Sequence, residues 1–133
     1  MNLEELLSGI SGNEPASAKE IEAVQTEMNI RFPNEYVRFL SYMNGGEGAL
    51  GRNNYISLWS THQLRDLNKS YEVPIFLPGV VLFGTDGGGE AYGFDWQSGK
   101  CAIVMVPFIG MSEATKTKIS DNFIDFLIDL CGS

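Results

Sequence analysis

Three strand-like segments in the second half of the chain are joined by connections too short to hold a helical crossover. Residues 80–83, 90–95 and 100–106 are rich in β-branched and aromatic side chains or alternate between apolar and polar ones. Residues 84–89 and 96–99 are all that separates them. Because neighbouring parallel strands need a crossover of about a dozen residues or more, these strands are predicted to pair antiparallel, as a meander.

Helical patterns dominate the first half of the chain. Ser17 and Glu20 form a capping box, and the apolar residues that follow recur at helical spacing, which predicts a helix over residues 18–28. Pro33 suits the first turn of a second helix, where its missing N–H costs nothing. Asn44-Gly45-Gly46 is predicted to end that helix, since Asn and Gly accept the left-handed conformation of a helix C-terminus.

The remaining segments complete the order of elements. They are a short amphipathic segment at 3–10, a loop at 47–54, a strand at 55–59, a helix started by Ser60 or Thr61, and a last helix started by Ser120-Asp121. This order predicts an α+β fold: a single domain over residues 1–133, with an antiparallel sheet of about four or more strands and flanking helices. A chain of this size can bury about two-thirds of its surface, enough for one core.

The chain is acidic, with 17 Asp and Glu against 9 Lys and Arg and a formal charge of −8. This balance argues against direct binding to nucleic acid and against docking on anionic lipid, because both need clustered Lys and Arg. It is compatible with a basic protein partner, although the same charge would also keep a protein soluble. Glutamate is concentrated in residues 1–30, so Glu20, Glu22 and Glu27 on the first long helix are candidate contacts for such a partner.

The sequence also indicates the cellular compartment of the protein. Its N-terminal residues lack the positive region and long apolar run of a secretory signal, and the longest apolar stretch, residues 101–111, is far too short to span a bilayer. Cys101 and Cys131 are isolated among apolar residues, which favours buried, reduced thiols over a disulfide. We therefore expect a cytoplasmic protein without a membrane segment.

No residue pattern predicts a metal or cofactor site. One histidine, His62, and two distant cysteines do not make a zinc site. The run from Asp86 to Glu90 lacks the ligand spacing of a calcium loop and the Gly-Lys-Ser/Thr ending of a phosphate loop. The sequence accordingly predicts no metal and no cofactor.

Two weak arrangements could suggest catalysis. His62 can pair with Asp66 at i+4, but no nucleophile motif accompanies it. Asp86, Glu90 and Asp95 could supply an acid and a base, yet Glu90 and Asp95 stand at odd spacing on one strand and therefore point to opposite faces. We expect a binding protein rather than an enzyme.

The triple glycine after Asp86 has two interpretations. It can be a tight connection between two strands, or a loop that lets a partner approach the main chain closely. On the second interpretation the contacts are Asp86, Gly87, Gly88 and Glu90. Further candidate contacts are Tyr92 and Trp96 as aromatic anchors, together with Glu47 and Tyr55 from the preceding loop.

Three motifs, in this order and spacing, resemble those of one family. The first runs from Ile21 through Phe32-Pro33-x-x-Tyr36-x-x-Phe39-Leu40 to Asn44-Gly45-Gly46; the second is Gly84-Thr85-Asp86-Gly87-Gly88-Gly89-Glu90-Ala91-Tyr92-Gly93-Phe94-Asp95; the third is Phe123-x-x-Phe126-Leu127. Together they resemble the SUKH superfamily, and within it the Smi/Knr group, over most of the chain.

The resemblance implies an α+β domain that works by protein contact, without catalytic residues to carry over. Many bacterial members look like immunity proteins that bind and neutralise a toxin encoded beside them, often a nuclease, whereas the yeast members regulate cell-wall synthesis and signalling. The leading hypothesis is thus an immunity protein, monomeric or homodimeric, for a cognate, basic toxin domain. The alternative is a regulatory scaffold similar to the yeast proteins, and the neighbouring gene would distinguish the two.

Overall fold

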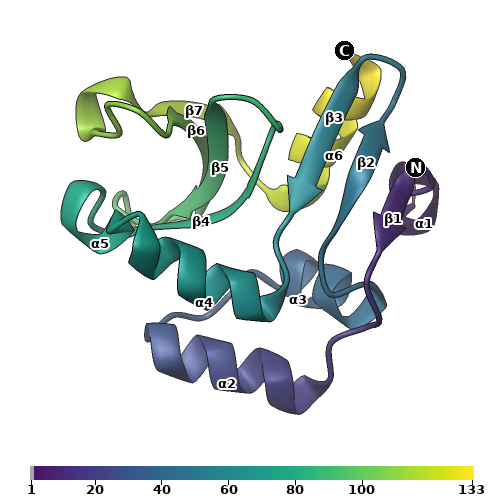
Figure 1. The fold of residues 1–133 in the computed structure, drawn as a ribbon, viewed down its shortest axis with the longest axis horizontal. Helices are drawn as coiled ribbons and strands as arrows, with labels where there is room; N and C mark the ends of the chain where they lie inside the picture. Colours follow the sequence, from purple (N-terminus) through teal and green to yellow (C-terminus); the bar gives the residue numbers. More distant parts are fainter. Residues whose placement is uncertain (1) are drawn as a thin grey trace.

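Seven strands form one sheet in which each strand pairs antiparallel with the next along the chain (Figure 1). The computed structural model describes residues 2–133. The strands are β1 (Ile10–Gly12), β2 (Gly46–Leu50), β3 (Asn54–Leu58), β4 (Val80–Thr85), β5 (Glu90–Asp95), β6 (Ala102–Pro107) and β7 (Thr117–Ser120). The predicted meander of β4, β5 and β6 is confirmed, and the sheet extends it at both edges.

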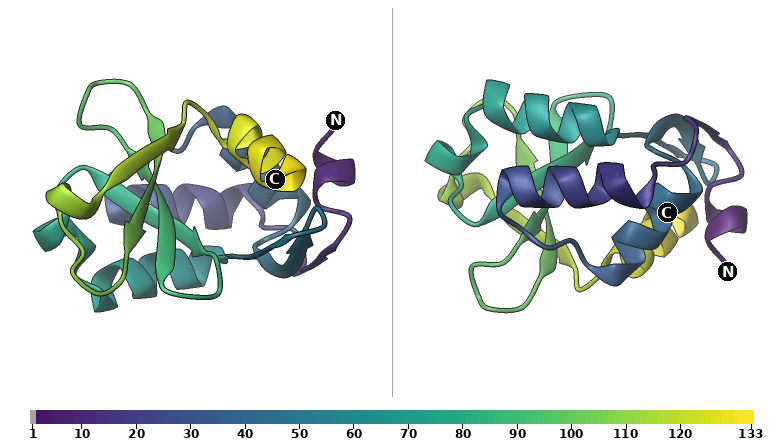
Figure 2. Two further views of the ribbon diagram at one scale, coloured as in Figure 1. Left: turned by 90° about the horizontal axis from the view of Figure 1, so that it is seen from above. Right: turned by 90° about the horizontal axis from the view of Figure 1, so that it is seen from below.

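Six α-helices flank the sheet, which confirms the α+β class for the part of the chain described. They are α1 (Leu3–Leu6), α2 (Ala18–Met28), α3 (Asn34–Tyr42), α4 (Thr61–Ser70), α5 (Val73–Phe76) and α6 (Phe123–Gly132), with a 3-10 turn at Glu113–Thr115. Ser17 begins α2 with a capping box, as predicted, and Ser60, one of the two predicted caps, begins α4, also with a capping box. Figure 2 shows α2 and α4 side by side against the sheet, while α6 lies with α3 and α1 at its other end.

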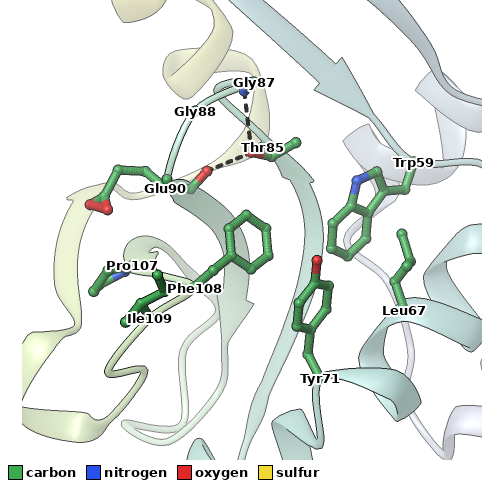
Figure 3. A pocket seen from close by; sticks show the side chains of 11 residues that line it. Trp59, Leu67, Tyr71, Thr85, Gly87, Gly88, Glu90, Pro107, Phe108 and Ile109 are labelled. Carbon is green, nitrogen blue, oxygen red and sulfur yellow. Dashed lines mark hydrogen bonds between the residues drawn. The ribbon is translucent and has the colours of Figure 1, made fainter.

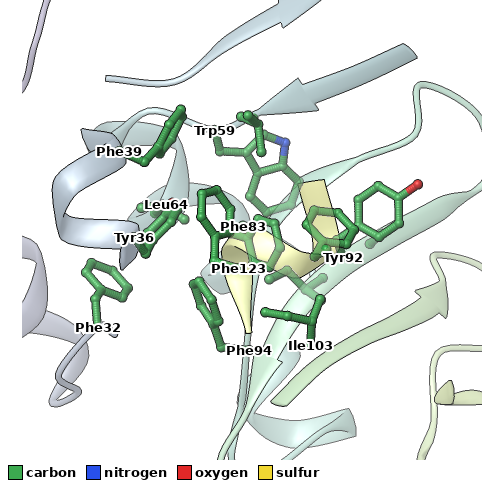
Figure 4. Close-up of a cluster of buried hydrophobic side chains, with 14 of the residues drawn as sticks. Phe32, Tyr36, Phe39, Trp59, Leu64, Phe83, Tyr92, Phe94, Ile103 and Phe123 are labelled. Atoms are coloured by element: carbon green, nitrogen blue, oxygen red, sulfur yellow. The ribbon is translucent and has the colours of Figure 1, made fainter. Parts of the chain in front are cut away.

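The core is built around a cluster of aromatic rings (Figure 4). Tyr36 of α3 is fully buried, and its ring centroid lies 4.8 Å from that of Phe94 and 5.1 Å from that of Phe123. Phe83 of β4 contacts the same rings, at 4.6 Å from Phe94 and 5.5 Å from Phe123. These contacts join α3 and α6 to the centre of the sheet.

A buried asparagine attaches α4 to the sheet. β3 ends at Leu58, which pairs with Gly84 of β4, so Leu82 lies beyond the end of the β3–β4 pairing. The register of β4 against β5 also shifts between Leu82 and Gly84. The Asn68 side chain pairs with both backbone groups of Leu82: Nδ2 donates to the carbonyl at 2.8 Å and Oδ1 accepts from the N–H at 2.9 Å. Asn68 thus takes the place of a strand neighbour and holds α4 beside β4.

The sequence patterns miss β2, predicted as a loop, because its residues are poor strand formers. Pairing with two neighbours decides its conformation instead. The close approach of β1 to β2 also requires glycine in β2: a Cβ at Gly48, whose φ is +154°, would lie 2.3 Å from the Gly9 carbonyl oxygen. β1 begins at Ile10, the last residue of the amphipathic segment 3–10, and within that segment α1 spans only Leu3–Leu6.

The Asn-Gly-Gly motif ends α3 for a reason other than the predicted one. Met43 follows the helix in extended conformation, so no left-handed cap forms there. Asn44 instead accepts a hydrogen bond from the backbone N–H of Thr61 at 2.8 Å. Gly45, at φ +78°, lies so close to the β3–α4 junction that a Cβ would be 2.6 Å from the Leu58 carbonyl oxygen. The motif therefore joins two distant parts of the chain.

Three smaller elements also differ from the prediction. α5 and β7 have no clear signal in the sequence, since each is four residues long and depends on its neighbours. The last helix is capped by Asn122, whose side chain accepts from the Asp125 N–H at 2.9 Å, rather than by Ser120-Asp121. The helix begins later because Ser120 still belongs to β7.

The first prediction concerns Asn68. Asn68→Ala leaves the buried N–H and carbonyl of Leu82 without these partners, so we expect a loss of about 2–4 kcal/mol in the free energy of unfolding. Urea denaturation followed by circular dichroism measures it. Asn53→Ala is the control, because Asn53 is exposed and donates only to the terminal Ser133 carbonyl; it should cost under about 0.5 kcal/mol. Equal losses for the two variants would contradict this role of Asn68.

The second prediction concerns Tyr36. Its hydroxyl is buried without a hydrogen-bond partner among residues 2–133, and this burial raises the pKa of Tyr36 well above its ordinary value. An unpaired buried hydroxyl is unfavourable, so Tyr36→Phe should leave stability unchanged or raise it by up to about 1–2 kcal/mol. Phe39→Ala in the same cluster should instead cost about 3–5 kcal/mol. A clear loss of stability in Tyr36→Phe would show that the hydroxyl is bonded.

Candidate protein-binding surface

The β2–β3 hairpin and the glycine loop, residues 86–89, lie side by side. Ser57 of β3 pairs with Thr85 of β4, which continues the register so that Tyr55 comes beside Gly87. A Cβ at Gly87 would lie 2.6 Å from the Tyr55 ring, and its φ is +82°, so glycine is required there on two grounds. Tyr55 in turn donates its hydroxyl to the Glu47 carboxylate. The structure thus gathers four predicted contacts: Glu47, Tyr55, Asp86 and Gly87.

Hydrogen bonds within the glycine loop determine its shape. Asp86 Oδ1 accepts from the N–H groups of Gly88 and Glu90, at 2.8 Å and 3.2 Å. Thr85 Oγ1 accepts from the Gly87 N–H at 3.2 Å and donates to the Glu90 carbonyl at 2.7 Å. Asp86 therefore has a structural role. The space beyond the loop is open, since a Cβ at Gly89 would meet nothing within 4 Å. Both interpretations of the triple glycine fit this geometry.

An apolar cleft of about 640 Å³ opens beside the glycine loop (Figure 3). We call it the aromatic cleft; its apolar lining is Trp59, Leu67, Tyr71, Phe108 and Ile109. The Tyr71 and Phe108 rings lie 4.8 Å apart, centroid to centroid, and Ile109 is 93% exposed. Glu90, a predicted contact, lies on the rim, where β5 pairs with Pro107 of β6.

Sequence reasoning missed Tyr71, Phe108 and Ile109. They stand in the connections after α4 and β6, outside the motifs that pointed to a binding site. One signal was present: Phe108 and Ile109 are large apolar residues in a segment that follows Pro107, which ends a strand. Apolar side chains in a surface connection are candidates for partner contacts.

Tyr92 is not available as the aromatic anchor that its sequence position suggests. It is 5% exposed, and its ring packs against Phe126 with centroids 4.8 Å apart. The reason is strand alternation, which turns Tyr92 to the core face together with Phe94. Burial, then the nearby Asp86 and Glu90 carboxylates, raise the pKa of Tyr92.

The three glutamates of α2 form a separate surface. Figure 1 shows α4 between α2 and the glycine loop. Glu20 accepts from the Ser17 N–H in the capping box, and Glu22 lies within 3.5 Å of polar atoms of the next turn. Glu27 forms a salt bridge with Arg65 of α4 at 3.2 Å. All three are exposed, but the charge of Glu27 is partly compensated.

Trp96 lies away from the glycine loop, just beyond the end of β5 opposite to Glu90. It is half-buried, its ring centroid is 5.8 Å from that of Phe94, and it lines a different cleft with Met28 and Pro78. The two aromatic anchors proposed from the sequence therefore do not share a surface with the glycine loop.

The residues considered for catalysis are dispersed. Asp95 pairs with Lys116 at 2.8 Å, Asp86 is bonded within its loop, and Glu90 is at the far end of β5 from Asp95. His62 and Asp66 form an exposed pair, 3.1 Å apart. Within residues 2–133, no group of three His, Cys, Asp or Glu side chains could hold a metal ion. Nor does any helix in this range have the length and apolar character needed to cross a membrane.

Both cysteines are free, as predicted, but they are partly rather than fully buried. Burial, with a contribution from Asp95, raises the pKa of the Cys101 thiol to about 11. Cys101 should therefore react slowly with thiol reagents at neutral pH.

The third prediction concerns the Tyr55–Glu47 pair. The hydrogen bond to Glu47, then slight burial and the negative charge of Glu47, raise the pKa of Tyr55. The protonated hydroxyl is the bonded form, so the pair is intact at neutral pH and is lost as the pH rises through this elevated pKa. Glu47→Ala should lower the Tyr55 pKa toward about 10. NMR titration of ring-labelled tyrosine measures it, with Glu4→Ala as the control; an unchanged pKa in Glu47→Ala would contradict the pair.

Comparison with protein families identifies most of the chain. The model of the SMI1 / KNR4 family (SUKH-1) matches residues 15–129, which include the helices α2 to α5, the glycine loop and most of α6. No curated protein matches the chain. Because the matched region covers nearly the whole α+β fold and all three sequence motifs, this chain belongs to the SMI1 / KNR4 family (SUKH-1).

Proposed function

We propose that this protein is an immunity protein, which binds a cognate bacterial toxin domain and neutralises it by protein–protein contact. Membership of the SMI1 / KNR4 family carries the proposal, because many bacterial proteins that resemble this family look like immunity proteins. The exposed apolar side chains of the aromatic cleft support it, since such groups on a surface favour a macromolecular partner.

Charge favours a basic partner. A nuclease toxin must present Lys and Arg to the phosphates of its substrate. A protein of net charge −8 is attracted to such a surface, and complementary fields speed encounter and exclude wrong partners. In this mechanism the bound protein covers the active site or substrate path of the toxin, in the cytoplasm where the toxin would act.

We propose further that the protein acts by binding alone. Asp86 is engaged within the glycine loop, Asp95 is paired with Lys116, and Glu90 lies at the opposite end of β5 from Asp95, which supports this proposal. Replacing Asp86 and Glu90 by Asn and Gln separates binding from catalysis: an enzymatic activity lost in this variant, with folding and partner binding retained, would contradict binding alone.

The fourth prediction uses the toxin encoded beside the gene. Purified protein should form a complex with that toxin and abolish its activity once it is in excess. The association rate should fall at least about tenfold between 50 and 300 mM NaCl, because the encounter is electrostatic.

Surface plasmon resonance and a toxin activity assay measure these effects. The triple change of Glu20, Glu22 and Glu27 to Gln should slow association; Gln retains the capping role of Glu20. A toxin whose activity is untouched at saturating protein would contradict the proposal. A gene neighbourhood without a toxin would instead favour the regulatory alternative.

A further inference from the structure

The aromatic cleft has walls that are firmly held. The Phe108 N–H donates to the Gly89 carbonyl at 2.9 Å, which joins the segment after β6 to the glycine loop. Trp59 is nearly buried at one side, and Leu67 and Tyr71 come from consecutive turns of α4 and its C-terminus. Figure 3 shows the Tyr71 and Phe108 rings beside one another; with centroids 4.8 Å apart they are in contact and line the cleft together. A cleft of this kind receives a ligand without rebuilding its walls.

The lining suits a side chain of a protein better than a metabolite. Sites for small polar molecules place several free polar groups around a pocket to orient the ligand. Here the Thr85 hydroxyl is engaged within the loop, and the one buried side-chain polar atom without a partner among residues 2–133 is the Tyr36 hydroxyl, in the core. What remains is apolar surface, to which Tyr71, 41% exposed, and Ile109, 93% exposed, both contribute.

The charge around the cleft has one sign. Glu90 lines it and forms no salt bridge with any described residue. Asp86 is on the glycine loop, whose glycines line the cleft, and Glu47 is bonded to the Tyr55 hydroxyl beside that loop. No Lys or Arg of residues 2–133 lines the cleft. An occupant that carries positive charge beside an apolar group is therefore favoured.

The glycine loop allows the main chain of a partner to approach it closely. Gly88 and Gly89 are exposed; a Cβ at Gly88 would have only the Asp86 carboxyl near it, at 3.4 Å, and one at Gly89 would have no neighbour within 4 Å. Side chains here would occupy space that is free in the folded protein. Because glycine has no side chain, the edge of the cleft at these positions stays open to a partner.

We propose that the aromatic cleft binds a segment of a partner protein in which a large aliphatic or aromatic side chain stands next to Lys or Arg. The apolar side chain packs on the surface formed by Tyr71, Phe108 and Ile109, and the cation pairs with Glu90. This rests on the proposed function in that the partner is the toxin, and it adds which surface is used and which chemistry that surface selects.

The test is selection of random peptides displayed on phage against the immobilised full chain. Enriched peptides should carry Lys or Arg next to Leu, Ile, Phe or Trp. Ile109→Ser should weaken their binding about tenfold, since it removes one large apolar side chain from the contact. The matched control is Ile75→Ser, because Ile75 is also exposed, at 69%, but lies on another cleft; its effect should be under about twofold.

The charge is tested by a second matched pair. Glu90→Gln should weaken the enriched peptides several-fold and reduce their salt dependence, whereas Glu14→Gln, an exposed acid outside the cleft, should not. No enrichment, enrichment of acidic or purely polar peptides, or equal effects of Ile109→Ser and Ile75→Ser would each overturn the proposal. Both isoleucines are exposed, so both variants should retain the circular dichroism spectrum of the unmodified protein.

The outcome is separable from that of the proposed function. Peptide selection does not use the toxin, so cleft-specific peptides together with an unaffected toxin would contradict only the immunity role. Conversely, a toxin neutralised equally well by Ile109→Ser and by the unmodified protein would contradict only the role of the cleft.

Discussion

The aromatic contacts of Phe83 with Tyr36, Phe94 and Phe123 are the interaction on which the rest of the structure depends. They bring α3 and α6, which are far apart in the sequence, onto the neighbouring strands β4 and β5. With one face of β4 covered by these rings, α4 packs beside the strand, where Asn68 satisfies the backbone of Leu82. The position of α4 in turn places Tyr71 beside Phe108, so the aromatic cleft follows from the way the core is filled.

The candidate surface consists of residues that the core does not need. Tyr71, Ile109 and the glycine loop all stand in segments that leave the sheet or a helix, and their apolar or bare backbone surface faces solvent. In contrast, Tyr92 belongs to a strand whose alternation turns it inward. Exposed apolar groups beside an uncompensated acid are characteristic of a surface that a basic partner covers, and this agrees with the function proposed from the family.

Local signals in the sequence predicted much of the fold. The Ser17 capping box, the start of α4 and the antiparallel order of β4 to β6 are each encoded by residues close together in the chain, and each is confirmed. β2 could not be predicted, because Gly46 and Gly48 form a strand only when β1 and β3 lie on either side. The hydrogen bond of Asn44 could not be predicted for the same reason, since its partner Thr61 comes from a distant part of the chain.

The sequence by itself determined the α+β class, the family and the acidic character, because caps, periodicity, motif spacing and net charge are properties of residue order and type. The tertiary structure decided which candidate contacts share a surface. It brought Glu47 and Tyr55 to the glycine loop, left Glu20 and Glu22 apart on α2, and buried Tyr92. The physical reason is that side chains become neighbours through strand register and core packing, and these depend on contacts between residues far apart in the chain.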